Sequence, residues 1–299
     1  MRRLWPLLIF IAIFILAIWA NNQKISRPIH SQTDQRIISL APSITETLFA
    51  LGAGEDVIAV SDFCDFPEQV QDLPKVGNLL SPNLEAIVQH QPDIVILSDA
   101  QSQTQQQLQR LHIPTLVVAM RTVEDIKSSI TEIGHAIAYQ QQARSLVDKI
   151  NNDIYQIQQK YQHQGSPRVM VSIGHTSKGN DFTQIFIAGQ HDFYNDLIEL
   201  AGGQNVYQRS QPAVPSLSIE GVLQLNPDII IDIFPDADDH QMSLPKVRQQ
   251  WRSLQQVNAV QNDQVYLLQA DYATIPGPRI VALLEQFVHF IHSDVEPTH

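Results

Sequence analysis

The chain of 299 residues contains a single cysteine, Cys64, and few charged residues, at 17%. One cysteine excludes an internal disulfide framework and a cysteine-based zinc ribbon, and it allows folding in an oxidising compartment. Basic residues are scarce, with 19 lysines and arginines against 31 acidic residues, and they form no long run. Contacts with nucleic-acid phosphates need clustered cations, so we expect no nucleic-acid partner.

Catalytic motifs are also absent. The sequence contains neither a G-x-S-x-G nucleophile elbow nor an H-E-x-x-H zinc motif. Residues 174–179 approach a phosphate-binding loop, but Asn180 stands where that loop needs lysine, and Phe182 to Ile187 are predicted to be extended rather than helical. The 11 histidines include no spacing that specifies a metal site. We therefore predict a protein that is not an enzyme and has neither a resident metal nor a cofactor.

The N-terminus differs from the rest of the chain. Arg2 and Arg3 precede an uncharged, largely apolar run that ends at Ala20. A short basic region before an apolar run is typical of a secretory signal. Ala20 suits the last position before a cleavage site, but Ile18, two residues earlier, is larger than the small residue usually preferred there. We predict that residues 1–20 are a signal peptide or an uncleaved N-terminal anchor and that residues 21–35 are a polar tether. Both alternatives place the remaining chain outside the cytoplasm.

Short apolar runs alternate with helical patterns from residue 36 onward, which predicts βαβ units. The first run is followed by Pro42-Ser43, where we predict a helix with Ser43 as N-cap and Glu46 completing a capping box. Apolar residues at three- and four-residue steps between Leu146 and Tyr161 predict a long amphipathic helix. The predicted fold is two α/β lobes with mostly parallel sheets joined by a single long helix: an N-terminal lobe over 36–121, a linking helical segment over 122–164 and a C-terminal lobe over 165–293.

An internal repeat relates the two lobes. Residues 83–96 align without gaps to residues 218–231, and each copy contains a glutamate followed by Pro-Asp and an apolar run. Glu85 and Glu220 occupy equivalent positions, 135 residues apart. Helix, Pro-Asp and strand form a common connection, which explains Pro-Asp but explains the matched glutamates less readily. We interpret the glutamates as a duplicated function, with charges at helix N-termini as the structural alternative.

Aromatic residues in the predicted loops indicate a ligand cleft. Phe63 and Phe66 flank Cys64-Asp65, and Tyr272 precedes a turn at residues 275–278. Ligands of open α/β sheets lie beyond the carboxyl ends of the strands, where such loops emerge. The alternative is that these rings cover loop cores. We place His175 in a loop-like stretch of the second lobe, where it lines the cleft or lies on the surface, and we expect Cys64 to be a small buried residue.

Several of these segments together resemble the iron-chelate/vitamin B12 class of periplasmic substrate-binding proteins, and within it the cobalamin-binding members. The resemblance covers about residues 35 to 292 and rests on the segments 36–46, 61–67, 83–93, 251–266 and 276–279. It implies the helical-backbone periplasmic binding protein fold, a ligand held between the lobes, and delivery to an ABC permease dimer that Glu85 and Glu220 contact. The predicted ligand-binding residues are Phe63, Phe66, Asn78, His175, Tyr272 and Arg279.

The ligand implied by the resemblance is a small-molecule metal chelate. Cobalamin or another corrinoid is the first choice, and a ferric siderophore or haem is the second, because residues 76–81 lack a tryptophan that cobalamin-binding relatives carry there. An anionic chelate would need cations, for which Arg121, Lys178 and Arg279 are candidates; Arg279 also suits a structural role at a helix start. We expect a periplasmic carrier that meets the membrane only through its permease or an uncleaved N-terminal segment. The alternative is a membrane-tethered sensor or adaptor with the same fold.

Overall fold

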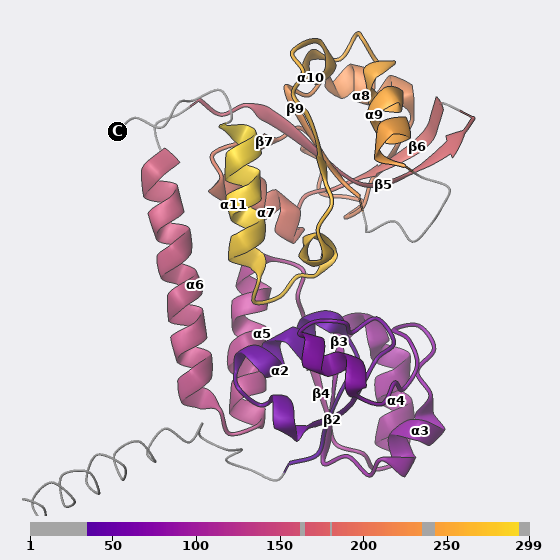
Figure 1. Cartoon of the computed structure of the whole chain (residues 1–299), viewed down its shortest axis with the longest axis vertical. Coiled ribbons are helices and arrows are strands. Elements are labelled where there is room, and N and C mark those ends of the chain that lie inside the picture. The colour runs from indigo at the N-terminus through magenta and orange to yellow at the C-terminus, as the bar shows by residue number, and fades with distance from the viewer. Residues whose placement is uncertain (1–34, 162–164, 180, 235–242, 293–299) are drawn as a thin grey trace, which may run out of the picture. The chain divides into compact units, whose positions relative to one another are not determined.

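The N-terminal lobe is a parallel sheet with helices on both faces. The computed structural model describes residues 35–161, 165–179, 181–234 and 243–292 (Figure 1). The strand order is β2-β1-β3-β4. Ile37 and Ile96 share a core cluster with residues of α2 and α5 (Val123–Ala136), and Ile38 and Val95 share another with residues of α3 and α4. The elements are β1 (Ile37–Ser39), α2 (Pro42–Ala50), β2 (Val57–Val60), α3 (Leu84–Gln89), β3 (Ile94–Ser98), α4 (Ser102–Arg110) and β4 (Thr115–Val118).

The C-terminal lobe contains a mixed sheet ordered β10-β9-β5-β6-β8, with β7 also paired to β5. β10, β9 and β5 are parallel, whereas β6 is antiparallel to both β5 and β8. The residues expected to resemble a phosphate loop lie in β5 and in the turn to β6. The elements are β5 (Arg168–Lys178), β6 (Asp181–Ile187), α7 (Phe193–Leu200), β7 (Gln204–Asn205), β8 (Ser216–Leu217), α8 (Ile219–Leu225), β9 (Ile229–Ile233), α9 (Leu244–Arg252), α10 (Asn258–Gln261), β10 (Val265–Leu268) and α11 (Ile280–Ile291).

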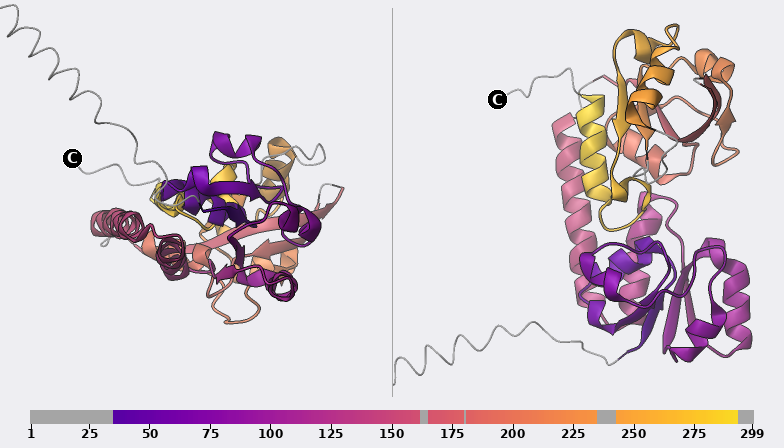
Figure 2. Two further views of the ribbon diagram at one scale, coloured as in Figure 1. Left: turned by 90° about the horizontal axis from the view of Figure 1, so that it is seen from below. Right: turned by 45° about the vertical axis from the view of Figure 1, so that its right-hand side comes forward.

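Two helices occupy the linking segment. α5 (Val123–Ala136) precedes the long helix α6 (Gln140–Tyr161), and the two pack side by side (Figures 1 and 2). The turn between them passes through Ala138, whose φ is 63°. α6 also contacts α7 and α11 of the C-terminal lobe. The long connecting helix predicted from the sequence is α6, and α5 is an additional helix that the apolar spacing did not separate from it.

The two lobes share one hydrophobic cluster. It contains Ile37 and Ile44 of the N-terminal lobe, Ile130 of α5, and Leu197 and Leu284 of the C-terminal lobe, together with residues of α6. A continuous core resists bending because its side chains interdigitate at crystal-like density. None of the helices in the described ranges combines the length and hydropathy of a membrane span. The predicted signal or anchor over residues 1–20 and the tether predicted over 21–35, apart from Gln35, lie outside those ranges.

The predicted cap of α2 is wrong. The N-cap is Ala41, which has extended backbone and makes no side-chain capping bond, and Pro42 begins the helix. Proline suits the first helical position because its missing N–H would have no partner there. Ser43 therefore lies within the helix, and the carboxylate of Glu46 bonds to Arg279 from the other end of the chain. A tertiary ion pair takes the place of the local capping box.

Candidate functional site

A cavity of about 350 Å³ lies at the carboxyl end of the N-terminal sheet. Its walls come from the segments that follow all four strands: residues 41–43 after β1, Ser61 and Phe63 after β2, Ser98 to Ala100 at the end of β3, and Met120 with Arg121 after β4. This is the position at which parallel α/β sheets bind ligands. Thr274, Ile275 and Pro276, from the loop before α11, complete the wall. The cavity is thus formed by segments more than 230 residues apart.

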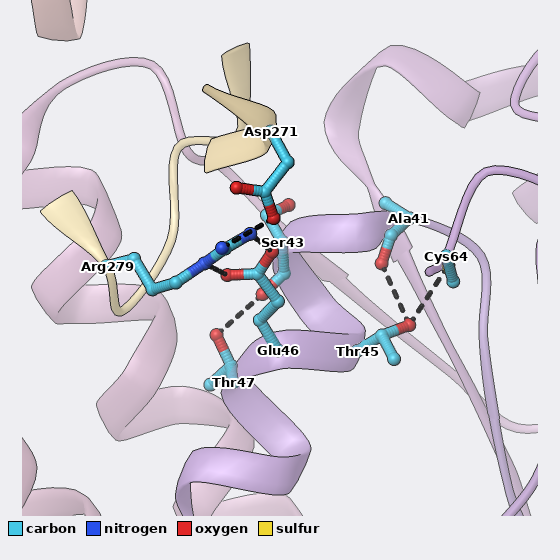
Figure 3. Close-up of polar contacts among 8 residues, drawn as sticks. All are labelled: Ala41, Ser43, Thr45, Glu46, Thr47, Cys64, Asp271 and Arg279. Carbon is cyan, nitrogen blue, oxygen red and sulfur yellow. Dashed lines mark hydrogen bonds and ion pairs between the residues drawn. The ribbon is translucent and has the colours of Figure 1, made fainter. Parts of the chain in front are cut away.

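Hydrogen bonds anchor two of the loops that line the cavity. Cys64 is buried, and its Sγ lies 3.1 Å from the hydroxyl groups of both Thr45 and Ser61. Figure 3 shows the contact with Thr45. Burial raises the pKa of the Cys64 thiol, whereas these hydrogen bonds lower it. Through its two contacts, Cys64 anchors the loop that carries Phe63. The Gln101 amide donates to the carbonyl oxygen of Leu79 at 3.2 Å and anchors the other loop. The prediction of Cys64 as a small buried residue is confirmed.

The cavity lining is largely apolar and has little net charge. Phe63 is 66% exposed at its rim, and Leu79, Met120 and Ile275 add further apolar surface. Arg121 is the only cation among the described lining residues, and it forms an ion pair with Asp99, which also lines the cavity. An exposed pair of this kind is neutral overall. The cavity therefore suits an apolar or uncharged ligand surface better than an anion.

Three of the predicted ligand residues meet outside this cavity, around one guanidinium group. Arg279 donates from Nε and Nη2 to the Glu46 carboxylate, at 2.9 and 2.6 Å, and from Nη1 to Asp271 at 2.6 Å (Figure 3). Its guanidinium carbon lies 4.0 Å from the Phe66 ring centroid and 5.3 Å from that of Tyr272. Burial raises the pKa of Glu46, whereas the hydrogen bonds and charge of Arg279 lower it. Phe66 and Arg279 line a separate cavity of about 340 Å³ together with Glu46.

The remaining predicted ligand residues, His175 and Asn78, contact residues of their own lobes. His175 lies in β5, not in a loop, and is buried, with its Nε2 3.5 Å from Asp232 Oδ2 and its ring tilted against Phe182. Trp251 Nε1 donates to the same Asp232 oxygen at 2.7 Å. Asn78 Oδ1 accepts from the backbone N–H groups of Leu80 and Ser81, which shapes the loop before α3. Neither residue lines the cavity.

The repeated segment forms the same structure in both lobes. Glu85 and Glu220 are exposed second residues of α3 and α8. Asn83 and Ser218 cap these helices by accepting from the backbone three residues on. The two helices both lie on the side of the lobes away from α6 (Figures 1 and 2).

The Pro-Asp motif has a structural role that sequence reasoning missed. The backbone N–H of Arg36 donates to Asp93, and that of Arg168 donates to Asp228, at 2.8 and 3.0 Å. Each arginine side chain also donates to a carbonyl group at the end of the helix that precedes the Pro-Asp motif. Arg36 donates to His90 O at the end of α3, and Arg168 donates to Leu225 O at the end of α8. An arginine at the start of a strand in both lobes was the available signal. The repeat thus places the two glutamates equivalently.

Leu79, Met120 and Ile275 line the cavity without having been predicted. Their sequence signal was weak, because isolated apolar residues in loops also serve as loop cores. What identifies them is their position after adjacent strands, which requires the strand order. Among the described residues, no group of three or more histidine, cysteine, aspartate or glutamate side chains is arranged to hold a metal ion.

The comparisons with known proteins agree with this architecture. A family model described as periplasmic binding protein matches residues 37–272. The vitamin B12-binding protein of Vibrio cholerae is 27% identical over 259 residues, covering 86% of this chain and 89% of that protein. A crystal structure of the periplasmic vitamin B12-binding protein of Vibrio cholerae has a TM-score of 0.71 at 28% identity, with 86% of this chain and 96% of that chain covered.

Two further proteins share this architecture. An uncharacterised ABC transporter substrate-binding lipoprotein of Bacillus subtilis is 26% identical over 280 residues, covering 92% of this chain and 84% of that protein. The periplasmic haem-binding protein of Vibrio cholerae has a TM-score of 0.74 at 21% identity, with 87% of this chain and 99% of that chain covered, and it supports the fold alone. The matched family model spans most of the two lobes, and the chain belongs to the periplasmic binding protein family.

Proposed function

We propose that this chain is the extracytoplasmic substrate-binding protein of an ABC importer and that it carries a corrinoid. The observation that carries the proposal is the apolar cavity at the carboxyl ends of four parallel strands, closed on one side by the loop 274–276. A non-enzymatic role agrees with the family. Relatives named for vitamin B12 binding support the choice of ligand.

The charge of the cavity favours a corrinoid over an anionic chelate. Haem carries propionates, and many ferric siderophores are anionic, so both need cations. Arg121 is paired with Asp99 and Arg279 with Glu46 and Asp271. Lys178, the third candidate, is exposed at the end of β5 and does not line the cavity. The corrin ring of cobalamin is bordered by neutral amides and methyl groups, which match an apolar wall with a few hydroxyls such as those of Ser43 and Ser61.

The metal chemistry points the same way. Haem-binding proteins supply an axial ligand from histidine, cysteine, methionine or tyrosine. The described lining contains no histidine, cysteine or tyrosine, and its Met120 is only 8% exposed. Cobalamin brings its own axial ligands and needs none from the protein. A corrinoid exceeds about 350 Å³, so we place one edge of its ring in this cavity and the remainder against loops of the C-terminal lobe.

The test is direct binding. Purified protein is titrated with cyanocobalamin, haemin and a ferric catecholate chelate, followed by absorbance and calorimetry. We expect saturable 1:1 binding of cyanocobalamin and at least tenfold weaker binding of the other two. Tight binding of haemin with a Soret shift, and none of cyanocobalamin, would replace the corrinoid by haem. Binding of none of the three would overturn the carrier proposal for metal chelates.

We further propose that Glu85 and Glu220 dock onto cations of a dimeric permease. Equivalent carboxylates on two lobes suit a two-fold partner, which presents the same patch twice. One exposed ion pair contributes only about 0.2–1 kcal/mol, and two engaged together gain from effective concentration. The alternative role is interaction with the helix dipole at each N-terminus.

A reconstituted transport assay separates these roles. Glu85→Lys and Glu220→Lys together should abolish ligand uptake into vesicles while leaving the dissociation constant for ligand unchanged, and each single reversal should be intermediate. Asp263→Lys, an exposed acid after α10, is the matched control and should transport normally. Normal uptake by the double variant would leave the helix-dipole role.

Export is proposed from the N-terminal segment. Residues 1–20 would direct the chain across the membrane and then either be removed or remain as an anchor. The mass of the protein isolated from membrane and soluble fractions distinguishes these fates, because cleavage removes about 20 residues. The tethered sensor or adaptor considered as an alternative finds no support among the relatives.

A further inference from the structure

The loop 271–278 is held between the two lobes by contacts at both of its ends. It begins with a single 3₁₀ turn, Asp271–Thr274, and ends at the start of α11. Toward the C-terminal lobe, the hydroxyl group of Tyr194 on α7 donates to the carbonyl oxygen of Ala273 at 2.6 Å. Toward the N-terminal lobe, a Cβ added at Gly277 would lie 3.5 Å from Ser43 Cα. The loop backbone therefore packs directly against α2.

Arg279 makes the strongest polar contacts of this junction. Its bidentate bond to Glu46 joins residues 233 positions apart, and both side chains are shielded, with 19% of the arginine and 2% of the glutamate exposed. Bidentate, charge-assisted bonds are strong and orient both partners. The third bond, to Asp271, joins the two ends of the loop. The ring of Phe66, from the N-terminal lobe, covers the guanidinium at 4.0 Å.

These contacts bear on the ligand cavity through the loop. Thr274, Ile275 and Pro276 form one wall of the cavity, and they lie between Ala273, bonded to Tyr194, and Arg279, bonded to Glu46. Arg279 itself does not line the cavity, and its donors are directed at two carboxylates. A change at Arg279 would move the wall without removing a ligand contact.

We propose that Arg279 is a positioning residue that ties the C-terminal lobe to α2 through Glu46 and thereby sets the width of the ligand cavity. Phe66 and Asp271 belong to the same tie. The consequence for the ligand rests on the proposed function, whereas the tie between the lobes does not. The competing role is direct contact with an anionic ligand, for which Arg279 would have to leave Glu46.

The first experiment measures the distance between the two lobes in the absence of a ligand. Spin labels are attached at Gln109→Cys on α4 and Gln249→Cys on α9, two exposed positions in different lobes, while the native Cys64 is fully buried. Pulsed EPR should give a narrow distance distribution for the parent and a broader one for Arg279→Ala and for Glu46→Gln. Arg279→Lys should lie between them, because lysine keeps the charge but lacks the planar fork. Arg144→Ala, at an exposed position on α6, is the matched control and should match the parent.

The second experiment measures cyanocobalamin binding by the same variants. Loss of a buried bidentate contact should weaken cyanocobalamin binding by about tenfold. Arg279→Ala, Glu46→Gln and their double variant should show the same loss of affinity, because all three break the same contact. If Arg279 instead contacts an anionic ligand, Glu46→Gln frees the guanidinium and should tighten haemin binding while Arg279→Ala weakens it.

The outcomes can still be distinguished if a variant does not fold or if cyanocobalamin does not bind. Thermal melting identifies an unfolded Arg279→Ala, and Arg279→Lys, which retains the charge, then decides the EPR comparison. If cyanocobalamin does not bind the parent, the proposed ligand is wrong, and the EPR distributions still test the tie. Distributions for Arg279→Ala, Arg279→Lys and Glu46→Gln that equal that of the parent, in folded protein, would overturn the inference.

Discussion

Phe63 and Phe66 are three positions apart in one loop and serve different parts of the molecule. Phe63 lines the cavity and is 66% exposed, whereas Phe66 covers the guanidinium of Arg279 and is 43% exposed. The sequence offers both as ligand contacts, since both are loop aromatics. The structure separates them: Phe63 lines the cavity at the carboxyl end of the sheet, and Phe66 lines the separate cavity beside Arg279.

Phe63→Ala should weaken ligand binding by about tenfold or more, because burying an aromatic side chain against a ligand contributes roughly 1.5–3 kcal/mol. The melting temperature of the unliganded protein should hardly change, since the ring is exposed and its loss leaves no internal cavity. Calorimetric titration with cyanocobalamin measures the effect. Leu80→Ala, at a position 92% exposed and outside the cavity lining, is the control. Equal affinities for the two variants would remove Phe63 from the site.

Asp192 combines a capping role with an unfavourable charge. Its carboxylate accepts from the backbone N–H of Tyr194 at 2.9 Å and caps α7. Burial raises its pKa from 3.8 to about 6; the charge of Asp196 adds to this, and the hydrogen bond from Tyr194 opposes it. The folded state therefore binds the proton more tightly than the unfolded state. The contribution of this group to the free energy of unfolding is greatest below about pH 3.8 and is lost as the pH rises to about 6.

Asp192→Asn keeps a good N-cap and removes the charge. It should raise the free energy of unfolding at pH 7.5 by about 1–2 kcal/mol, allowing for partial solvent screening, and raise the melting temperature by about 2–5 °C. At pH 3 the difference from the parent should be small, because the parent carboxyl is then largely neutral in both the folded and the unfolded state. Calorimetric melting at the two pH values provides the comparison. A gain that is the same at both would mean that the charge is not its origin.

At the scale of elements, the turn between α5 and α6 decides how the linking segment folds. α5 ends at Ala136, Ala138 takes a φ of 63°, and Ala143 returns along α5 next to Gly134. A Cβ at Gly134 would lie 2.4 Å from the Ala143 Cβ. The two helices can therefore approach closely only because residue 134 is glycine. This turn separates the linking segment into two helices.

Two substitutions at this turn should act in opposite directions. Ala138→Gly should stabilise the protein by about 0.5–1 kcal/mol, because glycine adopts positive φ without a steric cost. Gly134→Ala should destabilise it by about 1–3 kcal/mol through overpacking. Urea denaturation measures both, and neither residue is near the cavity, so ligand affinity should stay at the parent value. A neutral Gly134→Ala would mean that the helices separate at little cost.

At the scale of the whole molecule, the connection between the lobes restricts domain closure. α6 packs against α5 and also against α7 and α11, and one core cluster extends through these helices. Large closure in binding proteins requires hinge residues that absorb changes in φ and ψ. A packed helix offers no such residues without losing hydrogen bonds and buried contacts.

Small-angle X-ray scattering should therefore give the same radius of gyration, within error, before and after saturation with ligand. The same measurement on Arg279→Ala should give a larger change in the radius of gyration on binding, because the bond to Glu46 is absent while α6 is intact. A large decrease in the radius of gyration of the parent on binding would contradict a rigid connection. An equal result for parent and variant would assign the rigidity to α6 alone.

The sequence by itself determined the alternation of strands and helices in the two lobes, although it did not separate α5 from α6. Continuous apolar runs such as those of β3 and β9 identify buried parallel strands because such strands have no solvent-facing side. The gapless repeat predicted equivalent surroundings for Glu85 and Glu220, and the structure confirms them with matching caps and matching arginine contacts. These features are local, since each depends on residues within one strand, helix or turn.

Only the tertiary structure decided which side chains meet. Glu46 was assigned to a local capping box but pairs with Arg279, and His175 was assigned to a loop but is buried beside Asp232. The cavity requires the strand order β2-β1-β3-β4 and a loop from the other end of the chain. The physical reason is that a buried charge must find a partner to offset its desolvation, and that partner is selected by the packing of distant segments, which local periodicity and spacing do not specify.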